Sequence, residues 1–312
     1  MSVATALIRP LYHLGEHRPA LRGTRVRRAI FRTMESLSRQ QADAARSIFE
    51  AAEPGERLPI ERLPAMLEAA AAAKKPQRWD RRRPQDKARL RADEVRRSVS
   101  GRSVAGKRLI ELACGDGRVA MHLAEQGASV TGVDLSDHAM APEAAERVDL
   151  LVRDASALGV PDASVDAVYS FDAFEHFSDP AAVLSEVHRV LKPGGTLHTS
   201  FGPLWNSPFG AHQWGRLDLP YIHLLFDRSA LDTFADATGR PRLTVSCNEK
   251  PLASFRRLFT EADERFDRVS YLEKFNVSFA DRIAAFAPCF RASVGEFDEL
   301  IVRSIEVTLR KR

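Results

Sequence analysis

Cysteine is scarce in this sequence of 312 residues, with only Cys114, Cys247 and Cys289 present. Their odd number and wide spacing give neither a disulfide framework nor a zinc-ligand pattern, so we expect a reducing, cytoplasmic setting. Long apolar runs are missing too: none approaches the roughly 20 residues that a membrane-spanning helix needs. The first residues lack a basic segment followed by an apolar stretch, so we expect no signal peptide.

The sequence has no large excess of either charge, because its net charge is only +4, but the charged residues are distributed unevenly along it. Residues 1–108 hold 25 basic and 12 acidic side chains, and the remainder holds 21 and 30. A basic segment can bind nucleic acid or an anionic membrane surface. Here the basic residues are interleaved with acidic ones, and aromatic side chains that would stack on bases are few. We therefore expect no nucleic-acid partner and leave open a peripheral membrane contact through the N-terminal segment.

The N-terminal third has a helical composition. Residues 42–52 and 63–73 are rich in Ala, Leu, Glu and Arg, which favour helices. Residues 80–97 carry many charges and few apolar anchors, which is typical of a solvated helix or a flexible linker. We interpret residues 1–102 as a basic helical extension that serves as a lid or as a homodimer contact.

The pattern changes after Gly106, where short apolar segments begin to alternate with helical ones. The helical segments are 117–126 and a second one that begins near Pro180 and stops at Lys192-Pro-Gly-Gly195. This alternation predicts a parallel sheet covered by helices on both faces. The predicted strands cover residues 107–113, 128–133, 148–152, 165–170 and 196–201.

Acidic or small residues follow four of these strands, at the edge where such sheets bind ligands. The loop Gly115-Asp116-Gly117 fits a dinucleotide-binding pattern and is ambiguous alone. Glu111 lies in the turn before it, where it would repel a pyrophosphate but attract an ammonium and a sulfonium. Asp154 supplies an acceptor for an adenine amino group. These two acids favour S-adenosylmethionine over a dinucleotide.

Four segments then carry a family resemblance: Leu109–Gly117, Val130–Ser136, Phe171–His176 and Glu186–Gly195. Together they resemble the Rossmann-like, class I S-adenosylmethionine-dependent methyltransferases, in the group that methylates small molecules and sugars. The resemblance implies an α/β fold with a doubly wound, mostly parallel seven-stranded sheet and an antiparallel edge. On this basis residues 103–312 form the methyltransferase domain.

The remaining elements of that domain are less distinct in the sequence. We expect strands at residues 242–247 and 305–309, which would complete the sheet. Between them, residues 252–303 look mainly helical and are predicted to form a helical insertion.

The resemblance also implies roles for particular residues. Glu111 and the loop residues Ala113, Cys114, Gly115 and Gly117 would hold the methionine end of the cofactor. The ribose would bind Asp134, the adenine would meet Leu135, Asp154 and Ala155, and Phe171 would line the cofactor pocket.

One of these positions departs from the family pattern, since Ala113 stands where the family usually has glycine. Glycine serves there for close backbone approach or an unusual φ. Cys114 is predicted to be a small loop residue rather than a nucleophile, because nothing beside it in the sequence would lower the thiol pKa.

Methyl transfer from a sulfonium is an in-line displacement, in which positioning can contribute roughly 7–11 kcal/mol. A general base matters for an acceptor such as a hydroxyl. Residues 202–226 are rich in aromatic residues, Pro and Gly and are predicted to cover the active site. His212 and His223 in this loop, and His176 after the fourth strand, are the candidate acid–base residues. Without an assigned carboxylate partner they fall short of a metal-ligand set.

The acceptor is expected to be a small molecule, with a hydroxyl of a sugar, lipid-linked glycan or natural product favoured. The position after the fourth strand reads Phe171-Asp-Ala-Phe174, which lacks the Asn/Asp-Pro-Pro-Tyr/Phe signature of base- and amide-methylating enzymes. The alternatives are another S-adenosylmethionine enzyme on the same fold (an intramolecular cyclase or lyase), a basic nucleic-acid-associated protein, or a dinucleotide oxidoreductase.

Overall fold

The computed structural model describes residues 39–72, 83–212, 217 and 219–312. These residues divide into two compact units. The sheet unit comprises the described residues of Ala71–Trp205 with Val245–Lys274 and Arg303–Arg312. The helical unit comprises the described residues up to Ala70, with Asn206–Thr244 and Phe275–Val302.

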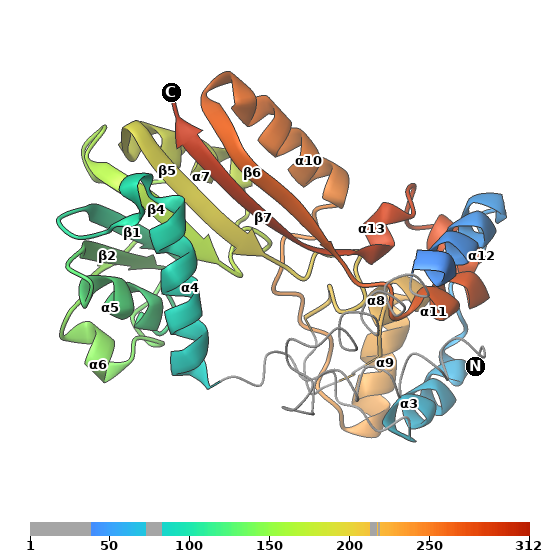
Figure 1. Cartoon of the computed structure of the whole chain (residues 1–312). Helices are drawn as coiled ribbons and strands as arrows, with labels where there is room; N and C mark the ends of the chain where they lie inside the picture. The colour runs from blue at the N-terminus through green and yellow to red at the C-terminus, as the bar shows by residue number, and fades with distance from the viewer. Residues whose placement is uncertain (1–38, 73–82, 213–216, 218) are drawn as a thin grey trace, which may run out of the picture. The chain divides into compact units, whose positions relative to one another are not determined.

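The sheet has seven strands in the order β3-β2-β1-β4-β5-β7-β6 (Figure 1). The five strands β1 to β5 are joined by parallel pairings, and β7 runs antiparallel to β5. This confirms the predicted doubly wound, mostly parallel α/β sheet. The strands are β1 (Arg108–Leu112), β2 (Ser129–Asp134), β3 (Asp149–Val152), β4 (Val165–Phe171), β5 (Leu191–Phe201), β6 (Phe266–Phe275) and β7 (Val302–Lys311).

Two helices cover one face of this sheet. The helix α4 (Pro84–Ser98) buries Ala88, Ala92 and Val95, which recur at helical spacing. The helix α5 (Arg118–Ala124) adds Val119, Ala120 and Leu123 to the same apolar core, together with Leu109, Val130 and Tyr169 of the strands. Residues 84–98 therefore form a packed helix, which decides between the two interpretations that the sequence left for this segment.

Further helices pack on the opposite face. The helix α10 (Leu252–Glu261) contacts Phe201 through Phe255, with ring centroids 5.0 Å apart. His198, three residues before Phe201, instead contacts Phe171 on the α4 side, as the alternation of side chains along a strand requires. The helix α7 (Pro180–Val190) is capped by Asp179, whose side chain accepts from the N–H groups of Ala181 and Ala182. The remaining short elements are α6 (Pro142–Ala145), η3 (Ser100–Arg102) and η4 (Ala262–Glu264).

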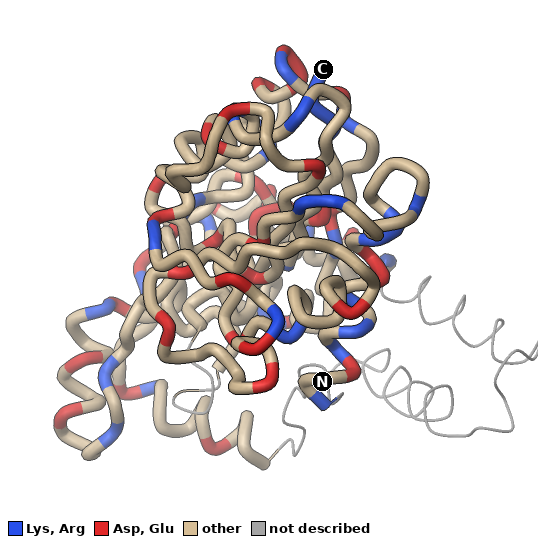
Figure 2. Tube along the Cα trace, turned by 90° about the vertical axis from the view of Figure 1, so that its left-hand side faces the viewer, with Lys and Arg blue, Asp and Glu red and all other residues tan. Residues whose placement is uncertain are grey.

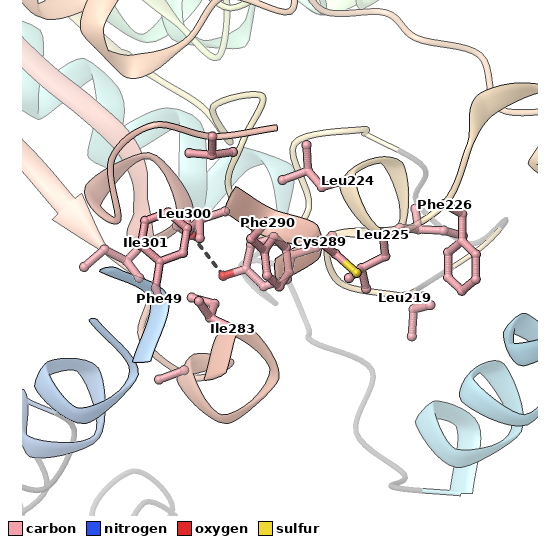
Figure 3. Close-up of a cluster of buried hydrophobic side chains, with 14 of the residues drawn as sticks. Phe49, Leu219, Leu224, Leu225, Phe226, Ile283, Cys289, Phe290, Leu300 and Ile301 are labelled. Atoms are coloured by element: carbon pink, nitrogen blue, oxygen red, sulfur yellow. Dashed lines mark hydrogen bonds between the residues drawn. The ribbon is translucent and has the colours of Figure 1, made fainter. Parts of the chain in front are cut away.

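The helical unit has an apolar core of its own (Figure 3). Phe49, Leu225 and Phe290 are at most 1% exposed in it, although they come from distant parts of the sequence. Backbone hydrogen bonds from Gly55 to Pro288 and from Leu58 to Leu225 tie the same segments together. Its elements are a helix over residues 39–51, η2 (Ile60–Arg62), α3 (Leu63–Ala72), α8 (Ile222–Leu225), α9 (Arg228–Thr238), α11 (Ala280–Ala285), α12 (Ala287–Arg291) and α13 (Asp298–Ile301).

Two sequence-based expectations about the C-terminal part are wrong. Residues 242–247 form no strand, and the edge strand is instead β6, inside the segment predicted to be a helical insertion. The alternation in 242–247 misled because only Leu243 among these residues is buried. β6 gave no clear pattern because an edge strand exposes side chains on both faces, here including Val269 at 50% and Leu272 at 52%.

The expected stop at Lys192–Gly195 is also different in detail. The helix α7 ends at Val190, and these residues already belong to β5. Val165 pairs with Leu191 and Ala167 pairs with Thr196, so the Lys-Pro-Gly-Gly segment forms an irregularity within the pairing.

The expected division at residue 103 differs from the two units. The helix α4 packs on the sheet, whereas 206–244 and 275–302 join the helices that precede Ala70. Contacts such as the Arg46–Asp298 ion pair, 2.6 Å between Nη2 and Oδ1, make this arrangement, and the order of the sequence does not reveal them. The role of residues 1–102 as lid or dimer contact stays a prediction, and residues 1–38 and 73–82 lie outside the described residues.

Candidate active site

Glu111 lies near the end of β1 with only 3% of its surface exposed. Its Oε2 atom accepts hydrogen bonds from the N–H of Ala120 at 3.0 Å and from the hydroxyl of Tyr169 at 3.3 Å. Burial raises the pKa of Glu111 to about 8, although both hydrogen bonds act to lower it. The carboxyl group is therefore largely protonated at neutral pH, and a cation placed beside it would favour its ionised form.

The loop after β1 adopts left-handed backbone conformations. Ala113, the residue that departs from the family glycine, has φ +52°. Side chains with a Cβ reach this region only at a steric cost, which explains the preference for glycine there. Gly117 has φ +69°, and a Cβ on it would lie 2.4 Å from Sδ of Met140. The loop is closed by the Gly117 N–H, which donates to the carbonyl of Cys114.

Asp134 connects this loop to the end of β2. Its Oδ2 accepts from the N–H of Gly115 at 2.9 Å, and its Oδ1 accepts from the N–H of Leu135 at 2.8 Å. Leu135 is 73% exposed, and Val152, which pairs with Asp134 in the sheet, is 54% exposed. Two exposed apolar side chains thus flank a carboxylate at neighbouring strand ends.

Asp154 follows β3 and forms a turn with Ser156. Its Oδ1 accepts from the hydroxyl and from the N–H of Ser156, at 2.6 and 2.8 Å. These hydrogen bonds lower the pKa of Asp154, so the side chain is ionised at neutral pH. The next residue, Ala155, is buried.

Phe171 at the end of β4 is covered by a cation from α4. The guanidinium carbon of Arg91 lies 4.7 Å from the centroid of the Phe171 ring. Arg91 also pairs with Asp172, as does Lys87, whose Nζ lies 3.3 Å from Oδ2. Burial would raise the pKa of Asp172, but the charges of Arg91 and Lys87 outweigh it and lower the pKa.

These two basic residues were missed by the sequence analysis. Lys87 and Arg91 are four residues apart, so they share one face of a helix. They also precede the buried Ala88 and Ala92 by one position each, which places them at the border of the apolar stripe. That spacing could have been recognised in the sequence, but nothing in the sequence indicated that the first turns of this helix lie beside the end of β4.

Glu175 is a second buried carboxyl group, with 2% of its surface exposed, and it too was missed. Its Oε1 accepts from the N–H of Gly202 at 2.8 Å, which joins the segment after β4 to the end of β5. Burial raises the pKa of Glu175 to about 8. Asn248 holds the same segment, because its amide donates to the carbonyls of Phe174 and Phe177, both at 2.9 Å.

The three candidate histidines fall in different units. His176 belongs to the sheet unit, where its Nδ1 lies 2.7 Å from the carbonyl oxygen of Ser246. A carbonyl only accepts, so Nδ1 carries the proton and Nε2 is the basic nitrogen of the neutral ring. His212, with φ +54°, and the buried His223 in α8 belong to the helical unit.

Cys114 is buried against β2, where a Cβ on Gly132 would lie 2.8 Å from its Sγ. Burial and the nearby carboxylates of Glu111 and Asp134 raise the pKa of this thiol to about 12. Such a thiol is a poor nucleophile at neutral pH, which agrees with the prediction that Cys114 is a small loop residue rather than a nucleophile. Within the described residues, no group of three or more His, Cys, Asp or Glu is arranged to hold a metal ion.

Residues 110–199 match the family described as "Methyltransferase domain". This match spans β1 to β5 and the strand ends described above. The chain carries a class I, S-adenosylmethionine-dependent methyltransferase domain. The family assignment made from the four sequence segments, and the cofactor that it implied, are thereby confirmed.

Relatives of this methyltransferase domain include enzymes whose names describe the methylation of an oxygen atom. The chain is 31% identical over 150 residues to a ubiquinone biosynthesis O-methyltransferase of Aromatoleum aromaticum, covering 46% of this chain and 62% of that protein. It is 35% identical over 115 residues to the 27-O-demethylrifamycin SV methyltransferase of Amycolatopsis mediterranei, covering 34% and 42%. A solved S-adenosylmethionine dependent methyltransferase from Mesorhizobium loti is 24% identical with a TM-score of 0.46, covering 73% and 100%. The chain spans about half the length of the curated relatives that it matches, from 38% to 62%.

Two features bear on other partners of the methyltransferase domain. Across the part of the chain that the structure describes, no helix is both long enough and apolar enough to cross a membrane. Basic and acidic residues are interspersed along the described trace in Figure 2. Much of the basic N-terminal segment, residues 1–38, lies outside the described residues, so its membrane contact stays a prediction.

Proposed function

We propose that the protein transfers the methyl group of S-adenosylmethionine to a hydroxyl oxygen of a small molecule, such as a sugar or a natural product. The observation that carries this proposal is the set of acidic side chains at the ends of consecutive strands: Glu111 near the end of β1, Asp134 at the end of β2 and Asp154 just after β3. The names of the two O-methyltransferase relatives support an oxygen acceptor.

The residues present fit the cofactor at its methionine end. Both hydrogen bonds to Glu111 end on Oε2, so its Oε1 is left for an ammonium group. The turned backbone of Ala113, Cys114, Gly115 and Gly117 would lie along the same part of the cofactor. The phosphates of a dinucleotide would instead gain no ion pair from Glu111 and would oppose its ionisation.

The adenosine end has matching side chains. Asp134 would accept from the ribose hydroxyls, since a carboxylate oxygen can accept a second hydrogen bond besides the one from the backbone. The exposed Leu135 offers an apolar contact for the adenine ring. Asp154 and Ala155 would meet the adenine edge, and Phe171 would form a wall of the same site.

When bound, S-adenosylmethionine would supply an activated methyl group on a sulfonium, whose sulfur would leave as a neutral thioether. The protein's own tasks are to align the acceptor and to take the hydroxyl proton. His176, His212 and His223 are the proposed residues for the proton, and residues 202–226 are the proposed acceptor loop. A homodimer and a cytoplasmic location remain part of this proposal.

Calorimetric titration with S-adenosylmethionine and S-adenosylhomocysteine tests the cofactor assignment. We expect both to bind and Asp134→Ala to weaken binding strongly, because it removes the ribose acceptor and the anchor of the loop. Asp149→Ala is the matched control, since Asp149 is an exposed residue at the opposite end of β3. Binding of a nicotinamide dinucleotide in place of S-adenosylmethionine would refute the proposal.

A further inference from the structure

Tyr169 on β4 and Glu111 on β1 are neighbours on adjacent strands of the sheet. They are register partners in the parallel pairing of β4 with β1, which places their side chains on the same face. Tyr169 is completely buried, and its ring lies 6.3 Å from the ring of Phe171. A tyrosine hydroxyl that is buried in this way needs a hydrogen-bond partner, and here it finds the carboxyl oxygen Oε2 of Glu111.

Oε2 of Glu111 is therefore fixed from two directions. The N–H of Ala120 reaches it from the first turn of α5, and the Tyr169 hydroxyl reaches it from β4. Both donors end on one oxygen, so the plane of the carboxyl group is set and Oε1 keeps its full acceptor capacity. Pre-arranged acceptors of this kind lose less freedom when a cation binds.

We propose that Tyr169 is a positioning residue of the cofactor site: with the Ala120 N–H it holds Oε2 of Glu111, so that Oε1 faces the ammonium group of the cofactor. This inference rests on the proposed function. It assigns to Tyr169 a role in cofactor affinity.

The hydrogen bond has a second effect, because it favours the ionised form of Glu111. The charged and titratable groups that act on Glu111 are Arg91 from α4, which lowers its pKa, and Asp116 in the loop, which raises it. Cys114 lies in the same loop, and its thiol stays protonated at neutral pH. Glu111 must give up its proton to solvent before it pairs with an ammonium, so binding is linked to pH through this carboxyl group.

Tyr169→Phe separates this role from packing, because phenylalanine keeps the buried ring and removes only the hydroxyl. We expect the pKa of Glu111 to rise further in this variant. The dissociation constant for S-adenosylmethionine should then increase about tenfold at neutral pH, as is typical for losing a hydrogen bond to a charged group. The ratio of the two dissociation constants should fall above the pH at which Glu111 is ionised in both proteins, and the loss that remains there is the contribution of positioning alone. Comparing the two proteins at each pH cancels the titration of the cofactor itself.

Tyr271→Phe is the matched control, since the Tyr271 hydroxyl also donates to a glutamate, Glu273, at 3.0 Å on β6. This variant should bind the cofactor as the wild type does at every pH. In a Glu111→Gln background, Tyr169→Phe should add no further loss. A ratio of one at neutral pH, or an equally large loss from Tyr169→Phe in the Glu111→Gln background, would overturn the inference. Absence of binding by the wild type would instead overturn the proposed function.

Discussion

Arg91 on α4 lies over the face of the Phe171 ring at the end of β4, with the guanidinium carbon 4.7 Å from the ring centroid. A cation in this position is attracted by the aromatic face, by about 0.5–1 kcal/mol at an exposed site. Its second contact, with Asp172, fixes the guanidinium at the strand end. A helix that precedes the methyltransferase domain in sequence thus contributes a side chain to the candidate site.

Arg91→Ala should weaken the binding of S-adenosylmethionine. The proposed site brings the cofactor's carboxylate near the loop after β1, and Arg91 is a cation that acts electrostatically on Glu111 in that region. We expect the dissociation constant to rise about tenfold, the usual effect of losing a charge-assisted contact. Arg89→Ala, on the exposed side of the same helix, is the control and should leave the dissociation constant for S-adenosylmethionine unchanged. Equal affinities of the two variants in calorimetry would show that Arg91 has only a structural role.

Ala113→Gly should stabilise the protein. The left-handed φ of +52° costs an alanine about 1–2 kcal/mol, whereas glycine pays only the larger entropy loss on folding. We expect a net gain of about 0.5–1 kcal/mol in the free energy of unfolding, measured by urea denaturation. Ala124→Gly in α5 is the control and should lose about 1 kcal/mol, because that alanine is helical. A loss at both positions would contradict the backbone conformation of the loop.

Glu175→Gln should change how stability depends on pH. Burial raises the pKa of Glu175 to about 8, so the folded state holds a proton that the unfolded state releases near 4.5. The free energy of unfolding therefore falls as the pH rises between these values, and the group's contribution is complete only below the unfolded pKa. Glutamine keeps the acceptor for the Gly202 N–H and cannot ionise. The free energy of unfolding of the variant should therefore fall less with rising pH than that of the wild type.

Denaturation series of the wild type and of Glu175→Gln across this pH range give the measurement. The exposed Glu261 on α10 provides the control, since Glu261→Gln should leave the pH dependence as it is. Parallel curves for wild type and Glu175→Gln would mean that Glu175 is ionised in the folded protein.

Replacing each candidate histidine by alanine distinguishes their roles in turnover. A residue that takes the proton of the acceptor should lower kcat by about 10²–10⁴-fold when it is removed. We expect the largest loss for His176, whose Nε2 is the basic nitrogen and which shares the sheet unit with the proposed cofactor residues. Cofactor affinity measured in parallel should be unchanged. If all three variants keep full turnover, none of the histidines is the base.

Much of the sheet could be predicted from the sequence, because the buried parallel strands are short apolar runs bounded by glycine and acidic residues. β1 to β4 lie within one residue of the predicted limits at both ends. β6 could not be predicted, since Asp267, Arg268, Glu273 and Lys274 break the apolar pattern of an edge strand that faces solvent. Residues 242–247 show the opposite case, an alternating pattern without a partner strand in the described sheet.

The candidate site was predictable where its residues follow strands and not where they come from elsewhere. Glu111, Asp134 and Asp154 follow from the rule that ligands meet the carboxyl ends of parallel strands. Tyr169 was hidden because it reads as an ordinary buried strand residue, and its hydroxyl gains a role only through the register of β4 with β1. Arg91 depends on a helix whose docking position the sequence does not encode in any local pattern.

The charged side chains of β6 also affect whether the exposed edge of this sheet can pair with the same edge of a second copy of the protein. If the β6 strand of a second copy paired antiparallel with this edge, residues directly opposite each other would have to point to the same face of the sheet. An odd-numbered residue would then lie opposite an odd-numbered one, and an even-numbered residue opposite an even-numbered one. Centring such a pair on Ser270 sets Asp267 opposite Glu273, and centring it on Tyr271 sets Arg268 opposite Lys274. Both arrangements oppose like charges, which protects an edge that exposes Val269 and Leu272 from growing into larger aggregates.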